Sequence, residues 1–422
     1  MVRSRIREGA VSFSRRAFLA LAATGCAAST APPGRKTAPL WFTYGGKNRQ
    51  VLEGLVKTFN LSQGEHWITP IYQGDYFEGL AKLRTAIAAR RAPALSHVVG
   101  EVVPYLAQAD VLEPLDDYPG ARQLDIVPAL GQAGSWIGGA ERRLVALPFN
   151  RSTPIAYLNG KLFAEKNLAA PKTWDELRAV ARAFTHDGRH GFGCPIDWWF
   201  WAALVGQAGG DVVEPDGRVS LGGEAGERAL DFWKTLVLDD KSMKPPPGRD
   251  YNAWEQTNQD FLGARVAMIW TSTAFLKYLE ENAPFPVVAA PLPAERRRAV
   301  PTGGTHWIML RAAPAEQKPT AWAFLRFMHE TANAITWATR TGYMPVTRAA
   351  IAQLEAEGYY QKHPNDRVAL DQLGVARPWP WSPDLFRVQR EIVQPRLEGA
   401  VLGGKGTRQS LDEARALATR WR

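Results

Sequence analysis

Residues 197–201 (DWWFW) hold a dense group of aromatic side chains, in which Trp198, Trp199 and Trp201 follow Asp197. The whole chain contains 16 tryptophans. Each indole carries an N–H that needs a partner when it is buried, so several in a row are awkward to place in a core. A flat aromatic face also packs on the C–H face of a sugar or polyol, or on a cation. The pattern indicates either core packing or one wall of a ligand cleft, with one of the three indoles facing inward in both cases.

Residues that could catalyse a reaction are sparse. Asp75, Glu78 and Glu101 could supply two carboxylates for glycoside cleavage, but the sequence does not give their separation. His186 and His190 have the spacing of two metal ligands on a helix face, yet a glycine lies between them and favours a solvent-exposed loop. The chain has neither a phosphate-binding glycine loop nor a Gly-x-Ser-x-Gly motif. We therefore expect binding without turnover, with no metal and no cofactor.

Alternating strand-like and helix-like runs must position these residues. Strand-like runs at 40–44, 67–72 and 96–103 alternate with apolar residues at helical spacing over 51–59 and 77–87. This β-α-β-α-β order predicts an α/β fold with a largely parallel sheet. Later strands are expected at 264–271 and 285–290, and one long helix at 320–341. We predict two α/β lobes with the chain crossing between them.

The N-terminus carries an export signal. Arg15 and Arg16 precede a short apolar segment that ends in small residues directly before Cys26. The segment is far shorter than the ~20 residues of a membrane-spanning helix. The pattern resembles a bacterial lipoprotein signal, which implies removal of residues 1–25 and lipid on the sulfur of Cys26. Residues 26–37 are then expected to form a flexible tether, and the protein is expected to be periplasmic or otherwise extracytoplasmic, anchored to a membrane.

The net charge and the cysteine content argue against a nucleic-acid-binding protein and against a disulfide. The formal net charge is +9, and removal of residues 1–25 takes away five arginines and one glutamate, which leaves +5. This balance over nearly 400 residues gives no support for a nucleic-acid partner, which requires a concentrated basic stripe. Cys194 has no second cysteine to pair with once Cys26 carries lipid, so no disulfide is expected.

Four segments form an ordered set of motifs along the chain. They are residues 146–159 (ALPFNRSTPIAYLN), 267–273 (AMIWTST), 303–307 (GGTHW) and 341–347 (TGYMPVT). Their order resembles the carbohydrate-type extracellular solute-binding proteins, the substrate-capturing subunits of ABC importers. Within that family, they most resemble the branch that binds sn-glycerol-3-phosphate and its diesters, such as glycerophosphocholine. The resemblance implies a two-lobed periplasmic-binding-protein fold (type II, clamshell) that acts as a monomer with an ABC permease as partner.

The resemblance also implies a set of ligand contacts. Glu101 falls at the glycerol-binding carboxylate and Trp198 at the stacking tryptophan. The phosphate-binding arginine is expected near the C-terminus, where Arg387 is the first candidate and Arg377 the competitor. Arg151 stands where the family usually has a small residue, and residues 379–381 (WPW) depart from the branch's pattern. The complete predicted set is Tyr76, Glu101, Ser152, Trp198, Trp201, Ser272, Gly304, Tyr343 and Arg387.

The resemblance predicts one mechanism and leaves two rivals open. The first lobe is expected over 38–148 plus 284–340 and the second over 149–283 plus 341–422, with the ligand in the groove between them. Closure of the lobes would exclude water around the ligand. An oligosaccharide-binding protein would use the same fold without needing an arginine for phosphate, and a secreted hydrolase would release product.

Overall fold

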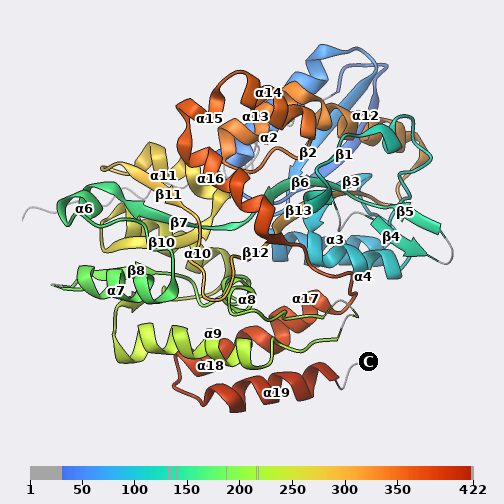
Figure 1. The fold of residues 1–422 in the computed structure, drawn as a ribbon. Helices are drawn as coiled ribbons and strands as arrows, with labels where there is room; N and C mark the ends of the chain where they lie inside the picture. Colours follow the sequence, from blue (N-terminus) through green and yellow to red (C-terminus); the bar gives the residue numbers. More distant parts are fainter. Residues whose placement is uncertain are drawn as a thin grey trace, which may run out of the picture.

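The computed structural model describes residues 31–131, 135–138, 141–186, 188–214, 216 and 218–419. In these residues the chain forms two lobes, each built on a five-stranded sheet with helices on its faces (Figure 1). No helix in this part of the chain is long and apolar enough to cross a membrane. The twin-arginine segment and Cys26 lie outside the described residues.

The first lobe has the strand order β2-β1-β3-β13-β6. These strands are β1 (Lys36–Phe42), β2 (His66–Tyr72), β3 (Leu95–Val99), β6 (Leu147–Ser152) and β13 (Gly303–Met309). The first lobe also contains α2 (Gly46–Ser62), α3 (Tyr76–Ala88), α4 (Val103–Gln108), α12 (Lys318–His329) and α13 (Thr331–Thr341). Leu40, Leu52 and Trp307 are fully buried between the sheet and its helices.

The second lobe has the strand order β11-β7-β10-β8-β9. These strands are β7 (Pro154–Asn159), β8 (His190–Gly193), β9 (Met243–Lys244), β10 (Val266–Ser272) and β11 (Val287–Ala290). Its helices include α6 (Gly160–Glu165), α7 (Trp174–Phe184), α8 (Trp198–Gln207), α9 (Glu224–Lys234), α10 (Asp250–Leu262), α11 (Leu276–Asn282), α16 (Pro364–Gln372), α18 (Gln394–Val401) and α19 (Thr407–Thr419). Trp201, Phe200 and Trp233 are completely buried in its core.

Two small sheets and several short helices complete the described chain. The sheets pair β4 (Ser135–Gly138) with β5 (Glu141–Leu144), and β12 (Val300–Pro301) with β14 (Ala376–Arg377). The short helices are α5 (Pro128–Gly131), α14 (Arg348–Ala356), α15 (Tyr359–Lys362) and α17 (Leu385–Arg387).

Strand pairing moves two of the predicted lobe boundaries. Strand β6 pairs with β13 in the first sheet, so the first crossing falls after Ser152 and not at residue 148. Strand β11 pairs with β7, and Val300 of β12 packs in the core of the second lobe, which places this part of 284–340 in the second lobe. The return crossing lies between β12 and β13. A third link between distant segments is the backbone bond from Met344 N to Arg151 O at 2.9 Å. These crossings place the ends of several strands next to the groove between the lobes.

Three details of the sequence prediction are wrong. Each large sheet is mixed, because β13 pairs antiparallel with β3 and β6, and β7 pairs antiparallel with β10 and β11. The helix expected at 320–341 is two helices, because Glu330 is extended (ψ 141°). The strand expected at 96–103 ends at Val99, after which Gly100–Val102 form a 3₁₀ turn that leads into α4.

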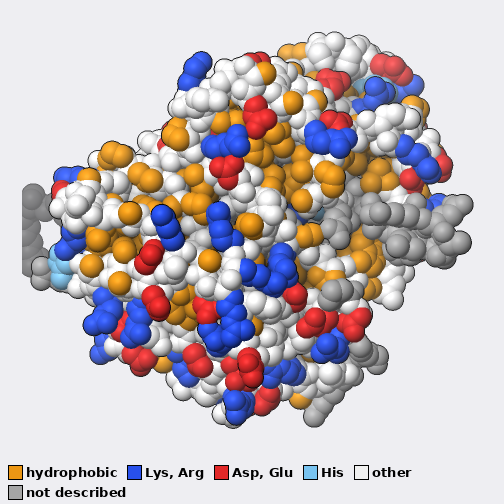
Figure 2. Space-filling view, in the orientation of Figure 1, with side chains coloured by type: hydrophobic (Ala, Val, Ile, Leu, Met, Phe, Trp, Pro, Cys, Tyr) orange, Lys and Arg blue, Asp and Glu red, His pale blue; other side chains and the backbone are white. Residues whose placement is uncertain are grey.

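Charged side chains of both signs are interspersed over the face of the molecule seen in Figure 2. A nucleic-acid-binding protein would instead gather its basic side chains into one stripe or patch. The visible face therefore agrees with the modest net charge of the chain.

Candidate functional site

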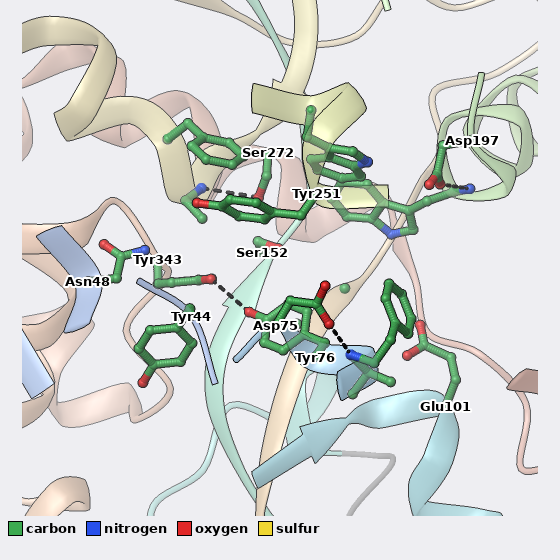
Figure 3. Close-up of a pocket in the computed structure, with 18 of the residues that line it drawn as sticks. Tyr44, Asn48, Asp75, Tyr76, Glu101, Ser152, Asp197, Tyr251, Ser272 and Tyr343 are labelled. Atoms are coloured by element: carbon green, nitrogen blue, oxygen red, sulfur yellow. Dashed lines mark hydrogen bonds between the residues drawn. The ribbon is translucent and has the colours of Figure 1, made fainter. Parts of the chain in front are cut away.

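A cavity of about 230 Å³ lies between the two lobes, and both lobes contribute to its walls. The first lobe contributes mainly strand ends and helix starts, and the second lobe contributes mainly aromatic rings (Figure 3). The lining residues include Tyr44, Asn48, Tyr72, Asp75, Tyr76, Phe77, Glu101, Ser152, Asp197, Trp198, Trp199, Tyr251, Trp254, Ser272, Phe275, Gly303, Gly304, Tyr343 and Arg390. Such a concave site, rich in aromatic residues with a few polar groups, is typical of small-molecule binding.

Most of the residues that the sequence predicted for a ligand site lie on this cavity. They are Tyr76, Glu101, Ser152, Trp198, Ser272, Gly304 and Tyr343. Ser152 and Ser272 end β6 and β10, and Gly304 lies at the start of β13. Their contact with a ligand stays a prediction, but the fold brings all seven together. Trp201 and Arg387 do not line the cavity.

A chain of hydrogen bonds fixes the tyrosines of the first lobe. Asn150 Nδ2 donates to the hydroxyl of Tyr76 at 3.1 Å. That hydroxyl lies 3.2 Å from the hydroxyl of Tyr343 (Figure 3). Asn150 Oδ1 accepts the backbone N–H of Thr305 at 2.7 Å. The ring of Tyr343 also stacks on Trp337, with the two planes 9° apart. These contacts hold two phenol groups at the cavity wall in fixed orientations.

Two lining aspartates serve as helix caps. Asp75 Oδ1 accepts the backbone N–H groups of Phe77 and Glu78, both at 2.8 Å, and so begins α3. Asp197 Oδ1 accepts the N–H of Trp199 at 2.8 Å and begins α8. A capping carboxylate satisfies backbone donors that have no partner in the helix. This role explains Asp75 structurally, and it removes the main support for a catalytic carboxylate pair.

Glu101 is a buried carboxyl group at one end of the cavity. It is only 6% exposed, and burial raises its pKa to about 7. Arg151 lies behind this wall and is 3% exposed, and its positive charge favours the ionised form of Glu101. Burial also lowers the pKa of Arg151 to about 10. An isolated buried charge is costly, so the two groups stabilise each other in the low-dielectric interior.

A group of tryptophans forms the wall that the second lobe contributes. Trp199 stacks on Trp254 with ring centroids 5.2 Å apart, and its Nε1 donates to the carbonyl of Thr302 at 3.3 Å. Trp198 takes its position from α8, where its backbone N–H donates to Gln394 Oε1 at 3.0 Å. The wall therefore consists of indoles whose positions are set by hydrogen bonds and stacking.

The prediction that Trp201 lines the cleft is wrong. Trp201 lies one turn further along α8, is completely buried and packs into the core of the second lobe beside Gly226 of α9. Helix α8 is apolar on all sides, so its sequence does not reveal which indole faces the ligand. Trp199, which the sequence singled out only as part of the cluster, lines the cavity instead.

The arginine at the cavity is Arg390, and neither predicted arginine lines it. The Cζ atom of Arg390 lies 3.4 Å from the ring centroid of Phe77. Arg387 lies three residues earlier and has an ion pair with Asp384 at 3.2 Å, while Arg377 pairs with Asp211. Residues Val388–Val393 form a π-helix, a rare form that often marks functional sites. Helical spacing in the sequence did not reveal this change of winding.

Several further residues of the site were missed by sequence reasoning. Tyr44 lines the cavity with a φ of 92°, a conformation uncommon for residues other than glycine. Tyr251, Trp254 and Phe275 come from the second lobe. The position of Tyr44 at the end of the first predicted strand was the one available signal. In the described part of the chain, no three His, Cys, Asp or Glu side chains are placed to hold a metal ion.

Comparison with known proteins identifies the group to which the chain belongs. Residues 54–365 match the family described as bacterial extracellular solute-binding protein. The sn-glycerol-3-phosphate-binding periplasmic protein UgpB of Salmonella typhimurium is 25% identical over 419 residues, covering 94% of this chain and 93% of the relative. The protein of the same name from Escherichia coli K12 is 25% identical over 401 residues, with 90% of each chain covered.

Solved structures show the same fold. UgpB from Mycobacterium tuberculosis, in complex with glycerophosphocholine, has a TM-score of 0.80 at 23% identity and covers 90% of this chain and 97% of its own. The GacH receptor of Streptomyces glaucescens, described unliganded and with acarbose, has a TM-score of 0.82 at 18% identity and covers 92% and 98%. The fold is therefore the two-lobed binding-protein fold. The chain belongs to the bacterial extracellular solute-binding proteins, which are binding proteins and not enzymes.

Proposed function

We propose that this protein is the substrate-binding lipoprotein of an ABC importer and captures sn-glycerol-3-phosphate or a glycerophosphodiester, such as glycerophosphocholine, between its lobes. The observation that carries the proposal is the composition of the cavity. One guanidinium, one buried carboxyl group and a set of aromatic faces line the same space. A glycerol phosphate ester with a cationic head group presents the complementary groups.

Each polar group of the cavity suits one part of such a ligand. The carboxylate of Glu101 accepts hydrogen bonds from vicinal hydroxyls, and Ser152 and Ser272 add hydroxyl groups. Arg390 offers a planar set of donors that can bind two phosphate oxygens at once. Gly304 has a φ of 94°, and a Cβ atom there would lie 1.8 Å from the carbonyl oxygen of Asn150, so only glycine fits. The glycine therefore lets β13 pass close to the backbone of β6 at the cavity wall.

The aromatic rings suit the remaining part of the ligand. Tyr44, Tyr72 and Tyr251 line the cavity together with the tryptophan wall. A quaternary ammonium group is attracted to the faces of such rings, with a gain of about 0.5–2 kcal/mol per ring. The relatives named for sn-glycerol-3-phosphate and the structure that contains glycerophosphocholine support this ligand class.

The lobes would close around the ligand and present one shape to a membrane permease. Contacts that already join them across the groove include Lys47 of α2 with Glu281 of α11, and Phe77 of α3 with Phe386, whose ring centroids are 6.0 Å apart. Ligand contacts on both lobes would add to these and shift the population toward the closed form. Lipid on Cys26 would hold the protein at the membrane surface that carries the permease.

An oligosaccharide ligand is the second candidate. The tryptophan wall suits sugar rings, and solved structures with sugars share the fold, including a maltose-bound protein from T. maritima with a TM-score of 0.81 at 19% identity. Arg390 favours a phosphate ester over a neutral sugar, because a guanidinium at the cavity wall can donate to phosphate oxygens.

Calorimetric titration with glycerophosphocholine, sn-glycerol-3-phosphate, maltose and maltotriose tests the proposal. We expect tight binding of at least one phosphate ester and no binding of the neutral sugars. Tight sugar binding with none to either ester would overturn the proposed ligand. Mass spectrometry of the ester after incubation provides a second readout: intact ester agrees with binding, and released choline would indicate a hydrolase.

A further inference from the structure

A second, smaller cavity of about 50 Å³ lies behind the tryptophan wall. The same elements line both cavities. Helix α8 contributes Trp198 and Trp199 to the main cavity and contributes Ala202 and Gly206, further along the helix, to the small one. The extended segment that contains β12 contributes Val300 and Pro301 to the small cavity, and β13 contributes Gly303 and Gly304 to the main one. The two cavities therefore lie next to each other along α8 and along residues 300–304.

Trp379 lines the small cavity and contacts Trp198 in the wall of the main one. Its Nε1 donates to the carbonyl of Thr302 at 3.1 Å, the same oxygen that accepts Trp199 Nε1 at 3.3 Å. Thr302 lies between the strand residues of the small cavity and those of the main one. The ring of Trp379 also contacts Trp198, with centroids 5.1 Å apart. One carbonyl oxygen thus fixes two indoles, one on each side of the boundary.

The backbone of the segment that carries Trp379 is also held in place. Strand β14 pairs in parallel with β12, which matches Pro301 with Arg377. Arg377 forms an ion pair with Asp211, and both residues line the small cavity. Further along, Trp381 and Phe386 pack against the core of the first lobe. The segment is anchored on both lobes, so the position of Trp379 does not depend on one contact.

We propose that Trp379 is a specificity-determining residue: it closes the end of the binding pocket and restricts the protein to ligands whose hydroxyl-bearing end is terminal. Trp379 contacts Trp198, which lines the pocket together with Asp197 and Glu101, so the closure lies at the end of the pocket that holds Glu101. The indole N–H of Trp379 also lowers the pKa of Glu101. A glycerol group ends there and fits. An oligosaccharide would have to continue past its first sugar into the space that Trp379 fills. The choice of glycerol ester follows from the proposed function, whereas the closure itself does not depend on it.

Substitution of Trp379 tests the closure. In W379A the two cavities should merge, and we expect affinity for maltotriose to rise at least about tenfold, because an indole-sized space opens beside aromatic walls. Affinity for glycerophosphocholine should fall by about tenfold, since Trp198 loses the ring that supports it. W379F keeps the bulk without the N–H and should retain the wild-type preference. Titration calorimetry of each variant measures both affinities.

Matched variants make the result decisive. W381A removes an indole from the same segment without opening either cavity, so its ligand preference should equal that of the wild type. If W379A does not fold, W379L removes the ring while keeping an apolar side chain, and thermal unfolding identifies the variant to use. A folded W379A or W379L with an unchanged ratio of maltotriose to glycerophosphocholine affinity would overturn the inference.

Failure of the proposed ligand would be seen separately. If the wild type binds maltose and neither phosphate ester, the glycerol ester is wrong, and the closure is then tested by the ratio of maltotriose to maltose affinity. A rise of about tenfold in that ratio in W379A supports the closure for a sugar ligand as well. An unchanged ratio rejects it.

Discussion

The two ends of the pocket are built from different chemistry (Figure 3). Glu101 and Asp197 lie at one end, which we call the carboxylate end, and Tyr44, Asn48 and Tyr343 lie at the other, the tyrosine end. The carboxylate end has ionisable groups, a charged residue behind its wall and Trp379 closing it. The tyrosine end has neutral hydroxyls and ring faces. This difference indicates that one end selects a fixed polar group while the other tolerates variation in the head group.

Arg390→Ala should have the largest effect, because it removes the cation that a phosphate between the two ends would contact. We expect affinity for sn-glycerol-3-phosphate to fall by about 100-fold, or about 3 kcal/mol, as when one partner of a close charge pair is truncated. Isothermal titration calorimetry measures the loss. Arg387→Ala is the matched control and should bind within about twofold of the wild type, since surface ion pairs contribute little. Equal losses in the two variants would reject Arg390 as the phosphate contact.

Trp198→Ala tests the aromatic part of the carboxylate end. Loss of this ring should weaken glycerophosphocholine binding by about 30-fold, or about 2 kcal/mol, with little change in the melting temperature. Trp201→Ala, in the same helix, should affect stability and not ligand contact. It should lower the free energy of unfolding by about 3–5 kcal/mol because it empties a core position. Titration calorimetry and thermal unfolding of both variants measure the two quantities, and a stability loss in Trp198→Ala alone would contradict the structure.

Glu101→Gln tests the charge of the carboxylate end. Burial raises the pKa of Glu101 to about 7, and the ionised form is the better acceptor for ligand hydroxyls, so wild-type affinity should rise as the pH increases through 7. Glu101→Gln should bind about tenfold more weakly at pH 8 and should lose this pH dependence. Titrations from pH 5.5 to 8.5 (roughly 1.5 pH units either side of that pKa) measure both effects. Affinity that falls with rising pH would show that the ligand uses the protonated carboxyl group.

The pKa of Glu101 also predicts how the stability of the ligand-free protein depends on pH. Stability should fall with rising pH, whereas ligand affinity should rise. The folded pKa of about 7 lies above the ordinary value of 4.5, so the folded protein retains a proton that the unfolded chain releases between these pH values. The free energy of unfolding should therefore fall as the pH rises through this window, and Glu101→Gln should reduce the slope. Urea unfolding at pH 5 and pH 8 measures the difference, given that the group changes protonation between about these limits.

Tyr343→Phe should have the smallest effect and tests the tyrosine end. It removes the hydroxyl that lies 3.2 Å from Tyr76 while keeping the ring that stacks on Trp337. We expect a loss of about 1 kcal/mol or less in affinity, because the ring face stays in place. If calorimetry shows a loss as large as that of Arg390→Ala, the two ends do not differ as we describe.

The sequence predicted the elements of the fold better than their pairing. Periodicity located β2 and α3 to within one residue of their observed bounds and found parts of β1 and α2, because it reflects which face of each element is buried. It did not predict the antiparallel strands, since β13 returns to the first sheet only after the chain has built much of the second lobe. The break at Glu330 was missed because the apolar pattern continues across it.

In the binding site, too, the sequence predicted some features and missed others. Ser152 and Ser272, which the family resemblance implied as ligand contacts, end β6 and β10 and line the cavity. Arg387 does not line the cavity, whereas Arg390, three residues later in the π-helix at Val388–Val393, does. Tyr251 and Trp254 gave no signal, since nothing local marks a helix that lies across a cleft.

The sequence alone indicated two α/β lobes, because hydrophobic spacing and capping residues act over a few neighbouring positions, and the resemblance to the solute-binding family implied a cleft and the residues that line it. Only the tertiary structure decided which indole and which guanidinium face the cavity, and that Trp379 lines a second cavity beside it. Those choices depend on the packing of segments far apart in the chain, such as Thr302 with Trp379 and Phe77 with Arg390, and the spacing of residues within one segment does not encode them.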